Sequence, residues 1–205
     1  MSRKKTAPRP ASTTGAGQGE VRIIGGDWRS RLLRFPDAGG VRPTPARIRE
    51  TVFNWLNFHL AGSHCLDLFA GTGALGLEAL SRGAGQVTFV DHTRALTEAL
   101  KTNIGLLQAH ERARVINQAA DAFLVAGTTQ AMDLIFLDPP FRQDWLARLC
   151  PLLEQHHWVK EGSWVYLECE SELRTPPVPA HWQLHRQKTA GQVAYSLYRV
   201  AGLSA

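Results

Sequence analysis

The chain has 205 residues, a mass of 22.6 kDa and 44% hydrophobic residues, which suffices for one domain with a full core but excludes a second large domain. No apolar run reaches the length of a membrane span and the first residues contain no secretory signal, so we expect a cytoplasmic protein. Three cysteines, Cys65, Cys150 and Cys169, lack CxxC spacing and lie in apolar stretches, which predicts reduced core residues and no metal site or disulfide.

Positive charge is concentrated in the first quarter of the chain. The whole chain has 23 Lys or Arg and 18 Asp or Glu, a net charge of +5. Residues 1–49 contain eleven of these bases and three of the acids, a net charge of +8, so the remainder has a net charge of −3. This asymmetry predicts one basic face, and the most common ligand of such a face is the phosphate backbone of a nucleic acid.

The first 61 residues divide into a tail and an ordered segment. Residues 1–19 are rich in Ser, Thr, Gly, Ala and Pro, which predicts a disordered basic tail that either helps to bind a partner or is only solvated. In residues 20–61, two β-type runs, 21–24 and 28–35, flank Gly25-Gly26 and predict a hairpin. Thr44 can then cap a helix whose first residue is Pro45, with an apolar stripe on one side.

From residue 62 to the end, short apolar strands alternate with amphipathic helices. We expect strands at 65–69, 86–90, 113–117, 133–137 and 164–167, and helices at 74–81, 94–107, 122–125 and 144–155. This α/β alternation predicts a mostly parallel sheet covered on both faces, with ligands at the carboxyl ends of its strands. Two last runs, 182–188 and 193–200, predict an antiparallel closing hairpin.

A Gly-rich turn follows the first strand of this series, in LDLFAGTGALG at 66–76. Gly71 and Gly73 allow the backbone to approach a ligand, and Asp91, at the end of the next strand, can accept hydrogen bonds from two ribose hydroxyls. The pattern predicts a nucleoside-containing cofactor. This pattern fits both a dinucleotide and S-adenosylmethionine. The residues predicted to contact the cofactor are Asp67, Phe69, Ala70, Gly71, Thr72, Gly73 and Asp91.

Two acids bear on the identity of this cofactor. Asp67 favours S-adenosylmethionine, because its carboxylate suits the ammonium end of a methionine moiety and not a pyrophosphate; it can alternatively hold only the turn. An adenine-binding Asp or Asn is often found immediately after the third strand, but here Asn117-Gln118-Ala119-Ala120 intervenes and the acid appears at Asp121. Either Asp121 or a backbone amide near Ala120 can contact the adenine. Asp121 can equally be only the N-cap of the next helix.

The tetrapeptide Asp138-Pro139-Pro140-Phe141 follows a buried strand, at the sheet edge that also carries the Gly-rich turn. Consecutive prolines can simply end a strand. The position favours catalysis on the exocyclic amino group of a nucleobase, because Asp138 and the Pro139 carbonyl can accept its two N–H bonds. Phe141 can stack on the base, and holding the nitrogen near the methyl group contributes through orientation, so no strong general base is needed.

With these motifs in place, the chain resembles the class I, Rossmann-like methyltransferases and, more closely, the bacterial RsmD family, which methylates N2 of one guanine in 16S ribosomal RNA. The resemblance runs from about Val21 to Arg199 and rests on IIGGDWR at 23–29, RPT at 42–44, RIRETVFN at 47–54, the Gly-rich segment, DPPF and AGQVAY at 190–195. It implies a seven-strand sheet, S-adenosylmethionine as donor, and a small-subunit assembly intermediate as substrate for a monomeric enzyme.

Carried over to this sequence, the resemblance implies three sets of site residues. The catalytic loop is Asp138, Pro139, Pro140 and Phe141, and the cofactor site is the set given above, extended by Ala120 and Asp121. The RNA-binding set lies in the basic N-terminal segment and comprises Arg22, Trp28, Arg29, Arg31, Arg34, Arg42, Arg47 and Arg49.

Other function classes explain less of the sequence. DNA or RNA methyltransferases that act on adenine N6 or cytosine N4 share a DPPF-type loop. Those that act on DNA need an added module to read the sequence and flip the base. The residues before the Gly-rich turn are too few to form such a module. An NAD-dependent oxidoreductase leaves DPPF unexplained. A non-catalytic RNA-binding module leaves the cofactor motif unexplained.

Overall fold

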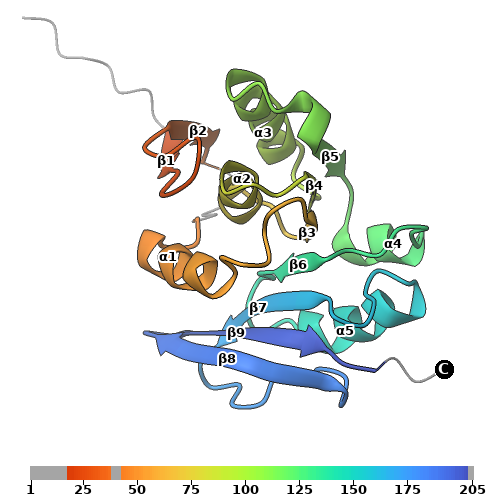
Figure 1. The fold of residues 1–205 in the computed structure, drawn as a ribbon. Helices are drawn as coiled ribbons and strands as arrows, with labels where there is room; N and C mark the ends of the chain where they lie inside the picture. The colour runs from red at the N-terminus through yellow and green to blue at the C-terminus, as the bar shows by residue number, and fades with distance from the viewer. Residues whose placement is uncertain (1–17, 38–42, 203–205) are drawn as a thin grey trace, which may run out of the picture.

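The computed structural model describes residues 18–37 and 43–202 and has a Rossmann-like α/β fold (Figure 1). A seven-stranded sheet has the strand order β5-β4-β3-β6-β7-β9-β8. The neighbours from β5 to β7 pair in parallel, whereas β9 pairs antiparallel with both β7 and β8. The strands of this sheet are β3 (His64–Asp67), β4 (Gln86–Asp91), β5 (Ala113–Asn117), β6 (Leu134–Leu137), β7 (Trp164–Glu170), β8 (Trp182–Ala190) and β9 (Val193–Val200).

Helices cover both faces of the sheet, as the alternating pattern predicts. One buried cluster joins α1, α2 and α3 to the sheet through side chains such as Phe53, Leu77 and Phe89. The other joins α4 and α5 through Leu124, Leu149 and Val165. The helices are α1 (Ala46–Trp55), α2 (Ala74–Ser81), α3 (Arg94–Leu106), α4 (Ala120–Val125) and α5 (Trp145–Gln155), with a short 3₁₀ helix at His110–Arg112.

The predicted N-terminal hairpin is present, with a different turn. It consists of β1 (Gln18–Arg22) and β2 (Leu32–Pro36), and Figure 1 shows it beside α2 and α3, apart from the main sheet. The connection runs from residue 23 to 31, because Gly26 leaves the strand to meet α2. A Cβ atom on Gly26 would lie 1.8 Å from the carbonyl oxygen of Ser81, and its φ is +73°, so this contact requires glycine.

Thr44 does not cap α1, which corrects the sequence-based prediction. The helix begins at Ala46 after Pro45, and no side chain caps it. Thr44 instead donates its hydroxyl hydrogen to Oδ2 of Asp138, at 3.2 Å. The hydrogen bond between Thr44 and Asp138, which are 94 positions apart, takes the place of the local capping bond that the sequence predicts.

Most other predicted elements match within a few residues. β7 extends three residues past the predicted end because its partner β9 continues to pair as far as Glu170. Cys65, Cys150 and Cys169 are buried free thiols, and burial raises the pKa of each. Among residues 18–37 and 43–202, no helix is both long and apolar enough to cross a membrane.

Candidate active site

A cavity of about 560 Å³ lies at the carboxyl edge of the parallel strands. It brings together the Gly-rich turn after β3, the end of β4 and the DPPF loop after β6, three segments that are separated in sequence. Its walls are formed by Pro43, Thr44, Asp67, Phe69, Ala70, Gly71, Thr72, Ala74, Leu75, Asp91, His92, Thr93, Leu96, Asp138, Pro139, Pro140 and Phe141.

The two glycines of the turn have different roles. Gly71 lines the cavity with a φ of +50°, and its amide donates to Oδ2 of Asp91 at 2.8 Å. Gly73 does not line the cavity. It precedes α2 with a φ of +77°, and a Cβ atom there would lie 2.5 Å from Cδ1 of Leu100. Gly73 therefore permits close packing of α2 against α3.

Asp91 is fixed in position before any ligand binds. Its Oδ2 accepts the Gly71 amide and its Oδ1 accepts the Thr93 amide, at 2.8 and 2.7 Å. A carboxylate offers about four lone-pair sites, so both oxygens can still accept further hydrogen bonds. The neighbouring His92 side chain is 74% exposed at the rim of the cavity. This geometry suits Asp91 to a vicinal diol such as that of a ribose.

Asp67 is a buried acid with one oxygen committed to the fold. Its Oδ2 accepts the amide of Gly76 at 2.9 Å, and the residue is 2% exposed. Burial raises the pKa of Asp67 to about 7, and the negative charges of Asp138 and Asp91 add to the effect. A cationic ligand group in the cavity would relieve this penalty, so the site fits an ammonium group.

The DPPF loop brings Asp138 to the cavity that the Gly-rich turn also lines. Asp138 is partly buried and follows the last residue of β6, Leu137. Burial raises the pKa of Asp138 to about 6, and the hydrogen bond from Thr44 opposes that shift. Oδ2 of Asp138 is held by Thr44, and Oδ1 is left to accept a hydrogen bond from a ligand.

Ala120 and Asp121 are not among the residues that line the cavity, and their contact with the cofactor stays a prediction. α4 begins at Ala120 after Ala119, so Asp121 lies in the first turn and is not the N-cap either. Its carboxylate pairs with Arg148 at 2.6 Å, and the Arg148 guanidinium lies 4.5 Å from the ring centroid of Trp145. Trp145 in turn contacts Phe69 edge to face.

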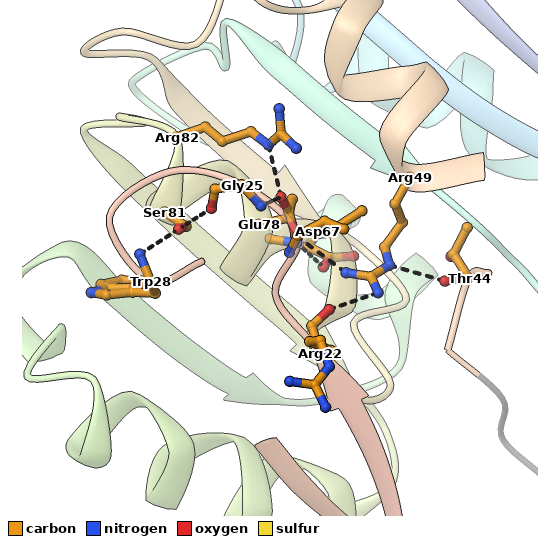
Figure 2. A network of polar contacts seen from close by, with 11 residues as sticks. Arg22, Gly25, Trp28, Thr44, Arg49, Asp67, Glu78, Ser81 and Arg82 are labelled. Carbon is orange, nitrogen blue, oxygen red and sulfur yellow. Dashed lines mark hydrogen bonds and ion pairs between the residues drawn. The ribbon is translucent and has the colours of Figure 1, made fainter. Parts of the chain in front are cut away.

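Arg49 is a structural residue, although the sequence places it in the RNA-binding set. It is 3% exposed and donates to Glu78, to the Thr44 carbonyl and to the Arg22 carbonyl. Figure 2 shows Glu78 between Arg49 and Arg82, with Thr44 and Arg22 beyond Arg49. Arg49 cannot reach RNA in this arrangement, and it joins α1, α2 and the N-terminal hairpin.

The other predicted RNA-binding residues lie mostly on the surface. Arg42 lies outside the described residues, as does nearly all of the predicted tail. Trp28 is partly buried under the guanidinium of Arg112, at 5.2 Å, and its amide donates to Oγ of Ser81. Five arginines remain exposed: Arg22, Arg29, Arg31, Arg34 and Arg47.

These arginines are not all close to the cavity. The 25–30 turn is tied to Ser81 at the end of α2, by the amides of Asp27 and Trp28. The cavity is at the opposite end of this eight-residue helix, which spans about 12 Å. Arg29 and Arg31 are exposed and do not line the cavity.

Sequence reasoning missed Thr44 as a residue that lines the cavity, and it missed the two buried acids Glu78 and Glu168, which do not line it. Glu168 is 3% exposed and accepts the Tyr166 hydroxyl at 2.8 Å. The register of the parallel strands pairs Phe136 with Tyr166, so Asp138 and Glu168, each two residues further on, fall side by side on one face. In this strand the polar residues Tyr166, Glu168 and Glu170 alternate with apolar ones. This alternation is the sequence signal from which Glu168 could have been found.

Comparisons with known proteins agree with this geometry. The family described as conserved hypothetical protein 95 matches residues 21–199. Ribosomal RNA small subunit methyltransferase D of Escherichia coli is 48% identical over 184 residues, which cover 90% of this chain and 92% of that protein. The protein of the same name from Haemophilus influenzae is 42% identical, over 89% of this chain and 95% of that one.

A solved structure extends the likeness to three dimensions. The Escherichia coli protein yhhF, described as a candidate methyltransferase, is 45% identical and superposes with a TM-score of 0.83, over 90% of this chain and all of that one. The matched region contains the Gly-rich turn, Asp91 and the DPPF loop. The chain belongs to this family, that of the RsmD methyltransferases.

Proposed function

We propose that this protein transfers a methyl group from S-adenosylmethionine to the exocyclic N2 of one guanine in 16S ribosomal RNA, during assembly of the small ribosomal subunit. The single observation that supports the proposal is that Asp67 and Asp138, from the neighbouring strand ends of β3 and β6, line one cavity. The names of the relatives, which are ribosomal RNA small subunit methyltransferases, support RNA as the substrate.

In this proposal, S-adenosylmethionine supplies an electrophilic methyl group on a sulfonium. Asp67 would hold the ammonium end of the cofactor through its free oxygen, and Asp91 would hold the ribose hydroxyls. Phe69, Ala70, Gly71 and Thr72 complete the wall on this side. The buried negative charge of Asp67 also suits the net positive charge of the donor.

The target amine would bind at the DPPF loop. Its lone pair is delocalised into the base, so the amine is a poor nucleophile until both N–H bonds are accepted by the protein. Oδ1 of Asp138 and the carbonyl of Pro139 are the acceptors, and Pro139 and Pro140 keep the backbone rigid without competing amide donors. Phe141, which lines the cavity, would stack on the base.

The experiment that tests donor and substrate together is transfer of a labelled methyl group. The full chain is incubated with labelled S-adenosylmethionine and either 16S rRNA, free or in 30S particles, or 23S rRNA as the control. We expect incorporation into 16S rRNA and none into 23S rRNA. Binding of NAD without binding of S-adenosylmethionine, measured by calorimetry, would contradict the proposed donor.

Substitution of Asp67 tests the cofactor site. Asp67→Asn retains an oxygen that can accept the Gly76 amide but loses the charge that faces the ammonium group. We expect affinity for S-adenosylmethionine at pH 8 to fall roughly tenfold to a hundredfold, the effect of losing a charged hydrogen bond.

The pH dependence supplies the control for this substitution. The pKa of Asp67 is raised to about 7, so the native protein should bind S-adenosylmethionine less well as the pH falls through that value, and Asp67→Asn should not. Calorimetry between pH 6 and pH 8 measures both effects. Equal affinities of the two proteins would mean that Asp67 only holds the turn.

The exposed arginines of the hairpin turn test the RNA interface. In the variant Arg29→Gln/Arg31→Gln we expect weaker RNA binding and a salt dependence flatter by roughly one unit per lost phosphate contact. Turnover at saturating RNA should be unchanged, because these residues are about a helix length from the cavity. Arg114→Gln is the matched control, since Arg114 is exposed on the face of the sheet that carries α4. Equal salt slopes in the two variants would exclude the turn from the interface.

A further inference from the structure

Three exposed cations on the C-terminal hairpin, β8 and β9, have no role in the function proposed above. The two strands contain Arg186, Lys188 and Arg199 and no Asp or Glu. Within the described part of the chain, none of the three pairs with an acid. The sequence hides this group, because the chain after residue 49 has a net charge of −3. The hairpin is thus a basic element in an acidic part of the chain.

The register places these cations on the face of the sheet that carries α1. Lys188 is opposite Tyr195 and Arg186 is opposite Leu197, and Arg199 lies two positions after Leu197 on β9. Residues directly opposite one another, or two apart in one strand, share a face. Tyr195 and Leu197 belong to the buried cluster that joins α1, α2, α3 and the N-terminal hairpin to the sheet. The two basic hairpins therefore lie on one side of the sheet.

α1 lies between the two hairpins and contacts both (Figure 1). Arg49 donates to the carbonyl oxygen of Arg22 in β1 at 2.9 Å, and the Trp55 ring stacks on Tyr195 of β9 with centroids 5.5 Å apart. Beyond α1, residues 183–190 of β8 are all exposed. The exposed cations of the two hairpins can therefore face the same partner.

Aromatic rings accompany these charges near the end of α1. The rings of His59 and Trp164 have centroids 4.5 Å apart, and Trp164 contacts His185 of β8 edge to face at 5.0 Å. Phe58, next to His59, is 91% exposed, so its ring contributes little to the core. Cations interleaved with aromatic rings are typical of surfaces that bind single-stranded nucleic acid.

Few acids oppose this positive charge. Glu50 is exposed on α1, where the exposed Arg47 offsets it, and Glu170 at the end of β7 is partly exposed. The pKa of His185 lies below its usual range, because its ring is partly desolvated and because positive charges surround it. These charges belong to Arg186, His59 and Arg199. A bound anion would relieve their mutual repulsion.

We propose that the α1 face of the β8–β9 hairpin, together with the end of α1, is a second contact surface for single-stranded rRNA. The proposal rests on the rRNA methyltransferase function proposed above. The cations would bind phosphate groups, and Phe58 would stack on an unpaired nucleobase. The register runs from Lys188 through β9 and β7 to the position of Asp138, about 14 Å away across three strand spacings. RNA on this surface is thus within reach of the strand that delivers the target base.

The salt dependence of RNA binding tests the cations. In each of Arg186→Gln and Lys188→Gln we expect weaker binding to free 16S rRNA and a slope of log affinity against log salt flatter by roughly one unit, and by roughly two in the double variant. Arg114→Gln is the matched control, since Arg114 is exposed on a strand but on the opposite face of the sheet, and it should keep the native slope. Native affinity for S-adenosylmethionine, measured by calorimetry, reports that each variant folds.

Phe58→Ala tests the stacking separately. Loss of the ring should lower affinity for 16S rRNA roughly fivefold or more at every salt concentration and leave the slope unchanged, because stacking releases no counterions. Val125→Ala is the control, since Val125 is also an exposed apolar residue, at 55%, but lies on α4. Equal affinities of Phe58→Ala and the native protein would exclude the end of α1 from the surface.

Two results would overturn the proposal as a whole. Native slopes in the Arg186 and Lys188 variants, with free 16S rRNA and with 30S particles, would mean that the cations only protect β8, the edge strand, from pairing with another chain. Weaker binding to 30S particles alone, with native binding to free 16S rRNA, would assign the surface to an acidic ribosomal protein. If the native protein transferred no methyl group to rRNA, the proposed function would fail instead, so the two failures are distinguishable.

Discussion

Replacement of Asp138 by Ala should lower turnover by a factor of about a hundred to a thousand or more, while affinity for S-adenosylmethionine stays within a few fold. The carboxylate is the acceptor that localises the lone pair of the target amine, and Ala leaves that N–H without a partner. The cofactor site is formed mainly by the Gly-rich turn, Asp67 and Asp91, so it remains intact. Single-turnover transfer of a labelled methyl group measures the chemical step directly.

The conservative variant is the control for this prediction. Asp138→Asn keeps one acceptor oxygen and loses the charge, so turnover should fall less than in Asp138→Ala. The native activity should also decline as the pH falls through about 6, where Asp138 becomes protonated, and Asp138→Asn should lack this decline. If Asp138→Ala retained more than a tenth of native turnover, the DPPF loop would not be the catalytic centre.

Replacement of Glu78 by Gln should destabilise the fold by about 3–5 kcal/mol, the usual cost of removing one partner of a buried ion pair. Glu78 is fully buried and accepts four hydrogen bonds, from the Ile24 and Gly25 amides and from Arg49 and Arg82. Gln cannot neutralise the two guanidinium groups, and Arg49 would be left charged in the interior. Urea unfolding measures the loss.

Two further measurements distinguish this effect from a general loss of fold stability. Glu98→Gln removes an exposed ion pair with Lys101 and should leave the unfolding midpoint unchanged. In Glu78→Gln, limited proteolysis should cut first near residues 18–37, because Glu78 is the acid that ties the N-terminal hairpin to α2. A loss of less than 1 kcal/mol would show that the network in Figure 2 contributes little to stability.

Periodicity and turn chemistry predicted most of the fold correctly. β5, α2 and β9 have the predicted bounds, because each is an apolar segment between clear boundary residues. The alternation of strands and helices also predicted that the Gly-rich turn and DPPF lie at the same edge of the sheet, as they do. These features depend on local sequence, which is why the sequence alone suffices for them.

The errors concern residues whose role depends on distant partners. Arg49 has the sequence context of an exposed helical arginine, but Glu78, 29 positions away, holds it in the interior. Thr44 has the context of an N-cap, but Asp138 accepts its hydroxyl hydrogen. Asp121 pairs with Arg148 on a neighbouring helix. Sequence spacing does not encode such contacts. Glu168 follows Tyr166 in β7 as Asp138 follows Phe136 in β6, and only the register between these two strands reveals that correspondence.

The identity of the methylated base is the most direct test of the central claim. The full chain is incubated with labelled S-adenosylmethionine and 30S particles or free 16S rRNA, and the product is digested to nucleosides and separated by chromatography. We expect the label in N2-methylguanosine, at one position, with no label when Asp138 is replaced by Ala. Label in N6-methyladenosine would contradict the account, because the DPPF loop would then serve a different base.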